Sequence, residues 1–380
     1  MPYLIVSTIG TSLLTNFAVS CEDRSVSLLL RETANLREKE LSQEERETID
    51  RIVQDVETRL SEAKPGEMRR SSAELNGIYG YYGQEVNKKQ LLARDVHILI
   101  ATDTYQGKET AHLVERHLRA LGVGMVQVLV PYGLSTRDCS SFSTGINQIV
   151  KWCEETLPGY ARAGYRIVFN LVGGFKGLQG YMNTLGMFYA DEIIYIFEAP
   201  SADLIRIPRL PVLLDEIPVL RQKAALFAMM VHGYLASREE VEGIPEICLD
   251  FDDQGSCTLS TWGLLIWERN KERVLGDHLQ QFPGLVYEKS FEKDFQAIKD
   301  KTRRADLQAT LAKVSLLFRS RGLEGLRSDP GLLYENYAGL KRTGIGHFRL
   351  NRNWRVSCQA AGSVLRLCHV GSHDYVNNKP

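Results

Sequence analysis

The segment from residue 347 to 356 gathers basic and titratable side chains with the spacing of a strand pair. His347 and Arg349 are two residues apart, so they share one face of an extended strand. Arg355 lies on the expected return strand, across a turn at residues 352–353. Guanidinium groups hold phosphate oxygens through paired hydrogen bonds, and imidazole exchanges protons near neutral pH. The pattern predicts a site that holds a phosphodiester and moves protons around it.

The end of the chain adds His373 and Tyr375, which follow a glycine. Metal-free RNA cleavage must remove a proton from the 2′-hydroxyl, give one to the leaving 5′-oxygen and stabilise a negative phosphorane. His373 or Tyr375 can transfer protons, and the arginines can stabilise charge. The basic residues expected to contact RNA are Lys341, Arg342 and Arg352.

Other histidine, aromatic and acidic residues of the same region are better explained by structural roles. His369 lies in an apolar run, which is typical of a packed histidine, and Trp354 is more typical of a core than of a base-stacking surface. Asp374 can orient a histidine or cap the terminus. The identity of the general base stays open, and His347 is a third candidate.

Charge is distributed unevenly along the chain. Residues 285–380 contain 17 Lys and Arg against 9 Asp and Glu, a net charge of +8, whereas the whole chain carries −1. A basic C-terminal part on an acidic body favours contact between that part and a polyanion.

Four expected strands end in loops rich in glycine, serine and threonine, at residues 8–12, 102–107, 132–136 and 172–177. In a parallel sheet these loops meet at the carboxyl edge, where ligands bind. Glycine lets backbone N–H groups approach a phosphate, and Lys176 supplies a counter-charge. The alternative for Gly173 and Gly174 is close packing of a helix on its strand. The candidate ligand-binding residues are Thr8, Gly10, Thr11, Ser12, Thr102, Asp103, Thr104, Gly173, Gly174, Phe175 and Lys176.

Neither a Walker A loop nor a GxGxxG fingerprint is present, which disfavours ATP hydrolysis and NAD chemistry. A nucleotide phosphate of another kind is the expected ligand.

The elements that must position these loops alternate between short apolar strands and helices. The expected strands cover residues 3–7, 97–101, 125–130, 166–171 and 192–197, with helices at 110–121 and 144–156 between them. This order predicts an α/β fold with a doubly wound, Rossmann-like parallel sheet. A charged helical insertion at residues 28–63 carries a capping box at Ser42 and Glu45, and we expect it to pack on the sheet or on a second subunit.

We expect three domains: a nucleotide sensor at residues 1–206, a connecting domain at 207–283 and a small α+β domain at 284–380. The connecting part has a helical segment at 221–235, a second at 237–241 and a hairpin at 247–259, which suggests a winged helix. The last part has a strand near 286–288, two helices at 293–299 and 307–318, and an antiparallel meander of strands at 346–351, 354–359 and 364–369.

The opening run 5–16 together with the "NLVGGFKG" run at 170–177 resembles the CARF domain family, the CRISPR-associated Rossmann fold, over roughly residues 1–205. The resemblance implies a homodimer that binds a cyclic oligoadenylate across its twofold axis, with cyclic tetra-adenylate as the expected ring.

The run "HFRLNRNWRV" at 347–356 and the run "HVGSHDYVNN" at 369–378 resemble the central hairpin and the C-terminal strand of the RelE/HigB superfamily of mRNA interferases, over about residues 285–380. The resemblance places Arg349 and Arg355 as phosphate-binding cations and His373 and Tyr375 as late acid–base or base-orienting residues. It implies cleavage of mRNA in the ribosomal A site.

The whole chain is similar to the CRISPR-associated mRNA interferase family, which implies a type III CRISPR effector whose cyclic ligand activates a metal-independent ribonuclease and arrests translation. One alternative is a ligand-responsive winged-helix DNA-binding regulator. It requires a basic recognition helix, but residues 237–253 are acidic. Another alternative is an inactive RNA- or ribosome-binding tail.

The composition of the whole chain is typical of a folded protein in the reducing environment of the cytoplasm. Its 380 residues are 44% hydrophobic and 24% charged, and the 7 cysteines are scattered without a CxxC pair. We therefore expect no disulfide framework, no zinc site, no metal cofactor and no membrane association, and the N-terminus does not resemble a signal peptide.

Overall fold

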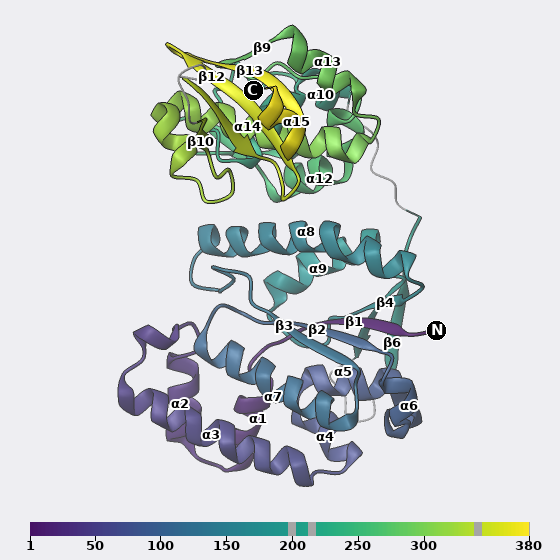
Figure 1. Cartoon of the computed structure of the whole chain (residues 1–380). Coiled ribbons are helices and arrows are strands. Elements are labelled where there is room, and N and C mark those ends of the chain that lie inside the picture. The colour runs from purple at the N-terminus through teal and green to yellow at the C-terminus, as the bar shows by residue number, and fades with distance from the viewer. Residues whose placement is uncertain (197–202, 212–217, 338–343, 380) are drawn as a thin grey trace. The chain divides into compact units, whose positions relative to one another are not determined.

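The computed structural model describes residues 1–196, 203–211, 218–337 and 344–379 (Figure 1). The chain forms two compact units, Met1–Leu213 and Leu214–Pro380. We call them the N-terminal and the C-terminal unit and describe each by itself. The predicted separation of a connecting domain from a C-terminal domain at residue 284 stays a prediction.

A six-stranded sheet forms the centre of the N-terminal unit, with the order β3-β2-β1-β4-β5-β6. The first five strands are parallel and β6 is antiparallel to β5. This is the order of doubly wound nucleotide-binding sheets. The five predicted strands are confirmed, except that residue 197 lies outside the described residues, and β6 was not predicted. The strands are β1 (Tyr3–Thr8), β2 (Val96–Ile100), β3 (Met125–Leu129), β4 (Arg166–Asn170), β5 (Glu192–Ile196) and β6 (Leu204–Pro208).

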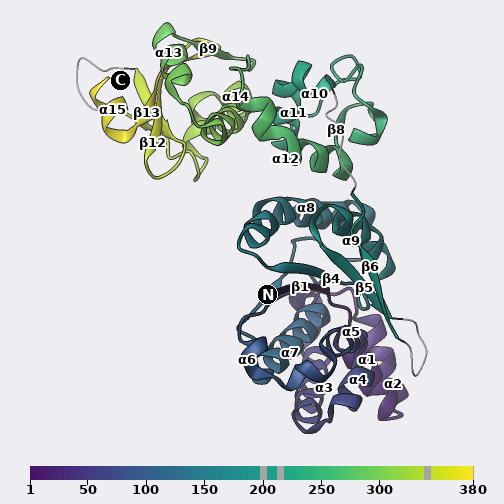
Figure 2. The ribbon, with the colours of Figure 1, turned by 90° about the vertical axis from the view of Figure 1, so that its right-hand side faces the viewer.

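Helices cover both faces of this sheet (Figures 1 and 2). One face carries α1 (Ser12–Ser20), α5 (Ala73–Tyr82) and α7 (Tyr105–Leu121). The other face carries α8 (Cys139–Arg162) and α9 (Lys176–Tyr189). Strands that are apolar on both sides require this arrangement, since each face of the sheet must be covered. The predicted α/β class with a parallel sheet is confirmed.

The helical insertion contains α2 (Arg24–Glu32) and α3 (Gln43–Glu62), and is followed by α4 (Pro65–Ser71) and α6 (Lys89–Leu92). The predicted capping box begins α3, because Ser42 Oγ accepts the Glu45 N–H and the Glu45 carboxylate accepts the Ser42 N–H. The buried face of α3 packs on α1 and α7. The insertion therefore packs on the helical layer that covers the sheet.

Strand β2 buries a histidine. His97 is fully buried, its Nε2 lies 3.0 Å from the Tyr82 hydroxyl, and that hydroxyl donates to Asp95 Oδ2 at 2.9 Å. Burial lowers the pKa of His97 to about 3, since the cation cannot be hydrated there. His117 of α7 also has a pKa lowered by burial, to about 4.

These histidines predict acid sensitivity of the N-terminal unit. Their folded-state pKa values lie below the unfolded value, so the stability is complete above a pH of about 6.5 and is lost as the pH falls towards the folded-state values. Each histidine contributes a loss of about 1.4 kcal/mol per pH unit in that window. His97→Gln, which keeps a donor for Tyr82, should remove roughly half of this slope in denaturant unfolding, whereas His112→Gln on the surface should not. An unchanged slope in His97→Gln would contradict the assignment.

The C-terminal unit contains a five-stranded sheet with the order β10-β11-β12-β13-β9. The predicted meander of β11, β12 and β13 is confirmed; β10 extends it, and β9 joins β13 in parallel. The strands are β9 (Leu285–Tyr287), β10 (Glu335–Asn336), β11 (Ile345–Arg349), β12 (Trp354–Ala361) and β13 (Val364–Ser372). The helices of this part are α13 (Lys289–Ala297), α14 (Lys301–Arg327) and α15 (His373–Asn378).

The predicted C-terminal strand at 369–378 is wrong in its second half. β13 ends at Ser372, whose hydroxyl accepts the Tyr375 N–H at 3.3 Å and so caps α15. A serine followed by an acidic residue in the first turn is a helix-start signal, and here it overrides the strand pattern.

The connecting segment consists of α10 (Pro218–Gln222), α11 (Ala224–Val231), a 3-10 turn (Glu246–Cys248), the hairpin β7 (Leu249–Phe251) and β8 (Cys257–Leu259), and α12 (Thr261–Leu275). The hairpin is confirmed. The expected helix at 237–241 is wrong, because these residues form turns that end near Gly243, which has a φ of +82°. Helix α12 was not predicted, and the winged-helix interpretation stays a prediction.

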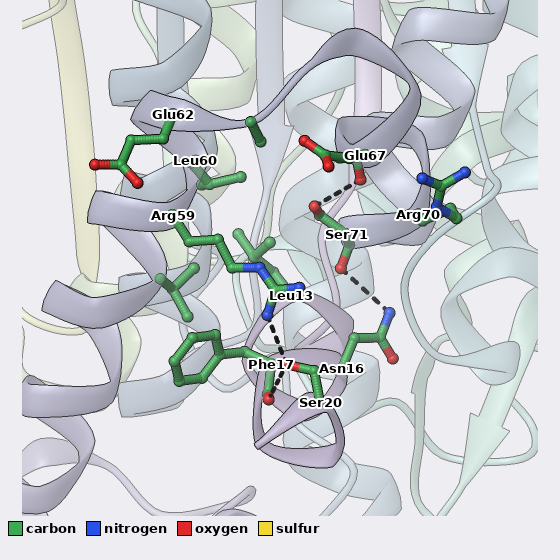
Figure 3. Close-up of a pocket in the computed structure, with 12 residues that line it drawn as sticks. Leu13, Asn16, Phe17, Ser20, Arg59, Leu60, Glu62, Glu67, Arg70 and Ser71 are labelled. Carbon is green, nitrogen blue, oxygen red and sulfur yellow. Dashed lines mark hydrogen bonds between the residues drawn. The ribbon is translucent and has the colours of Figure 1, made fainter. Parts of the chain in front are cut away.

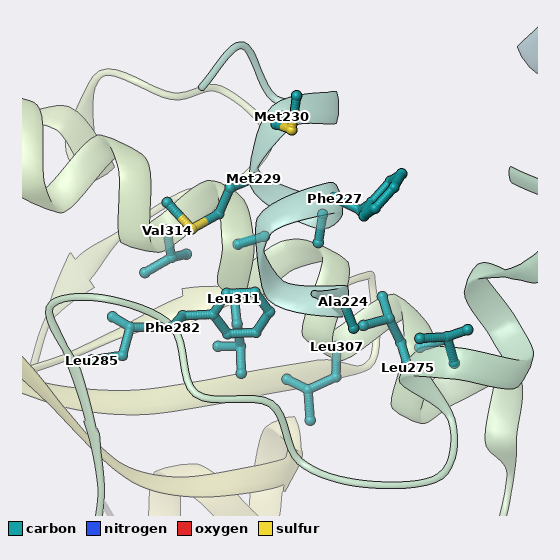
Figure 4. Packing of buried hydrophobic residues seen from close by; sticks show 14 of the residues in the cluster. Ala224, Phe227, Met229, Met230, Leu275, Phe282, Leu285, Leu307, Leu311 and Val314 are labelled. Carbon is teal, nitrogen blue, oxygen red and sulfur yellow. The ribbon is translucent and has the colours of Figure 1, made fainter. Parts of the chain in front are cut away.

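One hydrophobic core joins this segment to the C-terminal sheet. Phe227 of α11 and Leu275 of α12 belong to the same buried cluster as Leu311 of α14 (Figure 4). Cutting the chain at residue 284 would expose this face of α14 to water, whereas a fragment of residues 214–380 keeps the core.

Candidate functional site

The hairpin of β11 and β12 aligns the predicted cations on one face of the C-terminal sheet. Arg349 pairs directly with Arg355, and Phe348 pairs with Val356 in the adjacent position. Phe348 and Val356 are fully buried in the core. Because successive side chains alternate, His347, Arg349 and Arg355 project from the opposite face.

On that face a cavity of about 420 Å³ is lined by His347, Arg349, Arg355 and His373. We call it the His–Arg cavity. Four of the five residues predicted for catalysis thus share one concave surface, although they come from two strands and a helix.

The two arginines are held differently. Arg355 is 6% exposed, and its Nη1 donates to the carbonyls of Asn351 at 2.8 Å and Trp354 at 3.0 Å. Burial and the positive charge of Arg349 lower the pKa of Arg355. Nε of Arg349 is buried without a hydrogen-bond partner among the described residues. Like charges directly opposite across a strand pair repel each other, so this pair would be stabilised by an anion.

His347 lies beside these cations. Burial lowers its pKa, and the charges of Arg355, His373 and Arg349 lower it further against the opposing effect of Glu335. Its Nδ1 is buried and has no hydrogen-bond partner in the described part of the chain. The buried Nδ1 is closed to a substrate, but a neutral imidazole in the wall of the cavity is suited to accept a proton.

His373 is the first residue of α15. Its backbone N–H donates to the Asn353 carbonyl at 2.8 Å, which fixes the start of the helix to the β11–β12 turn. Its side chain is 52% exposed, with Asp374 Oδ1 3.1 Å from Nδ1 and Asn377 Nδ2 3.0 Å from Nε2. A solvent-exposed imidazole at the mouth of a cavity can exchange protons with water between turnovers.

Tyr375 does not line the His–Arg cavity. Because α15 is a helix, Tyr375 lies two helical positions from His373 and points elsewhere, and its hydroxyl donates to Asp294 Oδ1 at 2.7 Å. Burial, followed by this contact with Asp294, raises the pKa of Tyr375 to about 12. The geometry therefore does not bring Tyr375 to the predicted catalytic group.

Five further residues line the His–Arg cavity and were missed from sequence: Leu333, Glu335, Asn336, Tyr337 and Asn377. Glu335 pairs with His347 through β10, and the ring of Tyr337 lies 4.8 Å from that of His347. The Tyr337 hydroxyl is 3.1 Å from Asn377 Oδ1. Residues 334–337 read Tyr-Glu-Asn-Tyr, which does not alternate with the period of a strand, so no local pattern indicated these residues.

The predicted RNA-binding residues are only partly placed. Arg352 is exposed in the turn between β11 and β12 and does not line the His–Arg cavity. Lys341 and Arg342 lie outside the described residues.

In the N-terminal unit, a buried carboxylate occupies part of the predicted phosphate-binding loop. Glu74 of α5 is fully buried, and it accepts the Gly10 N–H at 2.7 Å and the Ser12 hydroxyl at 2.9 Å. A Cβ added at Gly173 would lie 2.2 Å from the same carboxylate. Gly10 and Gly173 are thus explained by close packing around Glu74. The Gly10 N–H and the Ser12 hydroxyl already donate to the Glu74 carboxylate.

The second glycine loop also packs closely. Gly174 has a φ of +91°, a conformation that L-residues rarely adopt, and a Cβ there would lie 2.9 Å from Thr8. The Thr8 hydroxyl donates to the Gly173 carbonyl at 2.5 Å. Phe175 packs edge-on against Phe142, and Lys176 is exposed as the first residue of α9. Lys176 and the half-buried Thr11 therefore remain accessible to a ligand.

The loop after β2 carries an ion-pair network. Asp103 contacts Arg37 Nη2 at 3.0 Å and Lys108 Nζ at 2.8 Å. Burial alone would raise the pKa of Asp103, but Lys108, the Gly133 N–H and Arg37 together lower it. Thr104 caps α7 and lies 2.9 Å from the Thr102 hydroxyl. A polar cavity of about 230 Å³ adjoins Asp103 and Arg37.

A separate cavity of about 500 Å³ lies between α1, α3 and α4 (Figure 3). Arg59 of α3 reaches across it to the Ser20 hydroxyl at 2.6 Å, and its guanidinium lies 5.9 Å from the Phe17 ring centroid.

Two observations concern the whole described chain. No helix among the described residues combines the length and the apolar character needed to cross a membrane. The same residues contain no group of three or more His, Cys, Asp or Glu side chains placed to hold a metal ion.

Known proteins are similar to parts of the chain. Residues 69–210 match the model of a family described as CRISPR-associated protein (Cas_APE2256). This part, which includes Glu74 and the second glycine loop, is therefore similar to a CRISPR-associated family. No curated protein matches the chain.

Solved structures similar to part of the chain include a copper-bound mutant toxin from Helicobacter pylori, with 21% identity over 25% of this chain and 99% of that one, at a TM-score of 0.20. YafQ from E. coli and a mutant of YafQ each show 15% identity over 25% of this chain and 97% of theirs, also at a TM-score of 0.20.

Proposed function

We propose that the chain is a CRISPR-associated endoribonuclease, in which the C-terminal unit cuts RNA and the N-terminal unit controls it. The observation that carries this proposal is the convergence of two histidines and two arginines in the His–Arg cavity. Two imidazoles and two guanidinium groups supply proton transfer and anion stabilisation, the two requirements of metal-free RNA cleavage.

In the proposed reaction, His347 takes the proton of the 2′-hydroxyl, because its lowered pKa keeps the imidazole neutral at about pH 7. The 2′-oxygen forms a bond to phosphorus while the bond from phosphorus to the 5′-oxygen breaks. His373 gives a proton to the leaving 5′-oxygen, and Arg349 and Arg355 hold the negative phosphorane. The products are a 2′,3′-cyclic phosphate and a 5′-hydroxyl, and the step needs no metal.

The proposed substrate is mRNA in the ribosomal A site, and the proposed activator is cyclic tetra-adenylate bound by a homodimer of CARF-type N-terminal units in the cytoplasm. The similarity of residues 69–210 to a CRISPR-associated family supports this assignment. Because Glu74 already holds Gly10 and Ser12, we place the ligand phosphates near Thr11 and Lys176. The ligand controls cleavage only if it binds the active arrangement more tightly than the inactive one.

We expect the full chain to be nearly silent on programmed ribosomes until cyclic tetra-adenylate is added, and then to cut the mRNA at least about tenfold faster, which corresponds to a coupling of about 1.4 kcal/mol. The measurement is mRNA cleavage with a panel of cyclic oligoadenylates of different ring size. Lys176→Ala should weaken activation without changing the low activity seen in the absence of ligand. Equal cleavage with and without every ring would contradict ligand control.

A further inference from the structure

A second cavity of the C-terminal unit, of about 490 Å³, contains Trp354 and Tyr375 in its wall. We call it the Trp–Tyr cavity. It is formed by the last turn of α13, the start of α14, the beginning of β12 and one side of α15. The proposed chemistry uses neither aromatic residue.

The ring of Tyr375 is fixed in place. Its hydroxyl donates to Asp294 Oδ1 at 2.7 Å, and Asp294 Oδ2 accepts from His369 Nδ1 at 2.8 Å and from the Val370 N–H at 3.2 Å. Both oxygens of Asp294 are therefore engaged within the protein. An aromatic ring that is already ordered loses little conformational entropy when a ligand stacks on it.

Cations accompany both rings. The Arg303 guanidinium lies 4.7 Å from the Trp354 ring centroid, and Lys379 Nζ lies 5.4 Å from that of Tyr375. Lys299 is exposed at the same cavity. The other carboxylate there, Asp300, caps α14 by accepting the Arg303 N–H at 3.3 Å. Aromatic rings beside exposed cations are the composition of sites that bind single-stranded nucleic acid.

Two elements, β12 and α15, contribute side chains to both cavities, although the cavities share no lining residue. Trp354 and Arg355 are consecutive in β12, so their side chains leave opposite faces of the sheet. His373 and Tyr375 are on α15, and each lines a different one of the two cavities. An RNA strand that passes over the end of β12 and around α15 would reach both.

We propose that the Trp–Tyr cavity binds an unpaired nucleobase of the substrate RNA, next to the phosphodiester that is cut. The base stacks on Trp354, with Tyr375 in the wall beside it, and Lys299 and Arg303 hold the neighbouring phosphate. This inference rests on the proposed function and adds to it a defined contact outside the reacting atoms.

The test uses the full chain, cyclic tetra-adenylate and ribosomes programmed with synthetic mRNAs that each carry one abasic nucleotide near the cut. Removing one particular base should lower kcat/KM of the wild-type protein by about tenfold to a hundredfold, the usual range for a stacked base. Trp354→Leu should show a similar loss of kcat/KM on intact mRNA. Removing the base at that position should then lower kcat/KM of this variant no further. Trp354→Phe, which keeps an aromatic ring, should restore both the activity and the sensitivity to that base.

The double variant Lys299→Ala with Arg303→Ala provides a test that does not depend on replacing Trp354. Both side chains are exposed, so their removal should leave the fold intact. It should raise KM by about tenfold and reduce the salt dependence of KM. The inference is overturned if the wild-type protein tolerates an abasic nucleotide at every position, or if Trp354→Leu remains as sensitive as the wild type.

A binding measurement separates this inference from the cleavage proposal. Single-stranded RNA that contains 2-aminopurine should lose fluorescence when its base stacks in the cavity, and Trp354→Leu should abolish that quenching. Quenching by a protein that cuts no RNA would support the base site and reject the nuclease. Cleavage without quenching at any position would leave the nuclease in place and reject the base site.

Discussion

Replacing His373 with alanine is expected to lower kcat for RNA cleavage by about 10²- to 10⁴-fold, the range for loss of a general acid or base. His373 is proposed to give its proton to the leaving 5′-oxygen during cleavage and not to bind the RNA. KM should therefore change little. The side chain is 52% exposed, and the contact of its backbone N–H with the Asn353 carbonyl does not depend on it. The thermal midpoint of the C-terminal unit should therefore stay the same.

The matched control is His278→Ala, which removes an exposed histidine of the same unit outside the His–Arg cavity. It should leave kcat unchanged. If His373→Ala and His278→Ala behave alike, His373 takes no part in proton transfer.

The pH profile distinguishes the two histidines of the site. Cleavage requires neutral His347, and the lowered pKa of His347 means that activity should fall only when the pH drops below the ordinary histidine value of about 6.5. In His347→Ala this acidic limb of kcat/KM should disappear together with most of the activity.

Replacing Arg349 with alanine is expected to lower kcat by about 10²- to 10³-fold, because it removes a donor aimed at the developing negative charge. Its Nε has no partner among the described residues, and the side chain faces another cation across the strand pair. Its removal should therefore leave the free energy of unfolding unchanged or slightly higher. Arg349→Lys should restore only part of the activity, because an ammonium group cannot make paired contacts with phosphate.

Two other arginines provide controls for this variant. Arg366→Ala removes an exposed arginine of β13 and should keep full activity. Arg355→Ala should lose both activity and stability, because Arg355 also bonds two carbonyls of the β11–β12 turn. Loss of stability in Arg349→Ala, with no separate loss of kcat, would argue that this residue is structural.

The sequence predicted those parts of the molecule that depend on local pattern. Apolar strands followed by glycine-rich loops indicated the parallel sheet, and the alternation of His347 and Arg349 indicated their common face. Both depend on the period of a strand, which is visible in a single segment.

The parts that were missed depend on a contact between distant segments and on one local helix cap. Glu74 bonds Gly10 and Ser12 from more than 60 positions away in the chain, and no spacing within either segment indicates that contact. Tyr375 was assigned to a strand because the capping effect of Ser372 was overlooked, and this single helix start moves Tyr375 away from His373. Turn and cap chemistry thus decided which residues face the cavity.

The shared core of the C-terminal unit affects how ligand control should be tested. A fragment that begins at residue 284 would expose Leu311 and its neighbours on α14, so its inactivity would report misfolding. The full chain and a fragment of residues 214–380 are the better pair for comparison.

The central claim is that the His–Arg cavity cuts RNA by attack of the 2′-hydroxyl without a metal. The most direct test maps the ends of mRNA cut by the activated full chain in the presence of excess EDTA. We predict 2′,3′-cyclic phosphate and 5′-hydroxyl ends from the wild-type protein and almost none from His373→Ala or Arg349→Ala. Ends with a 5′-phosphate, or equal cutting by all three proteins, would contradict the claim.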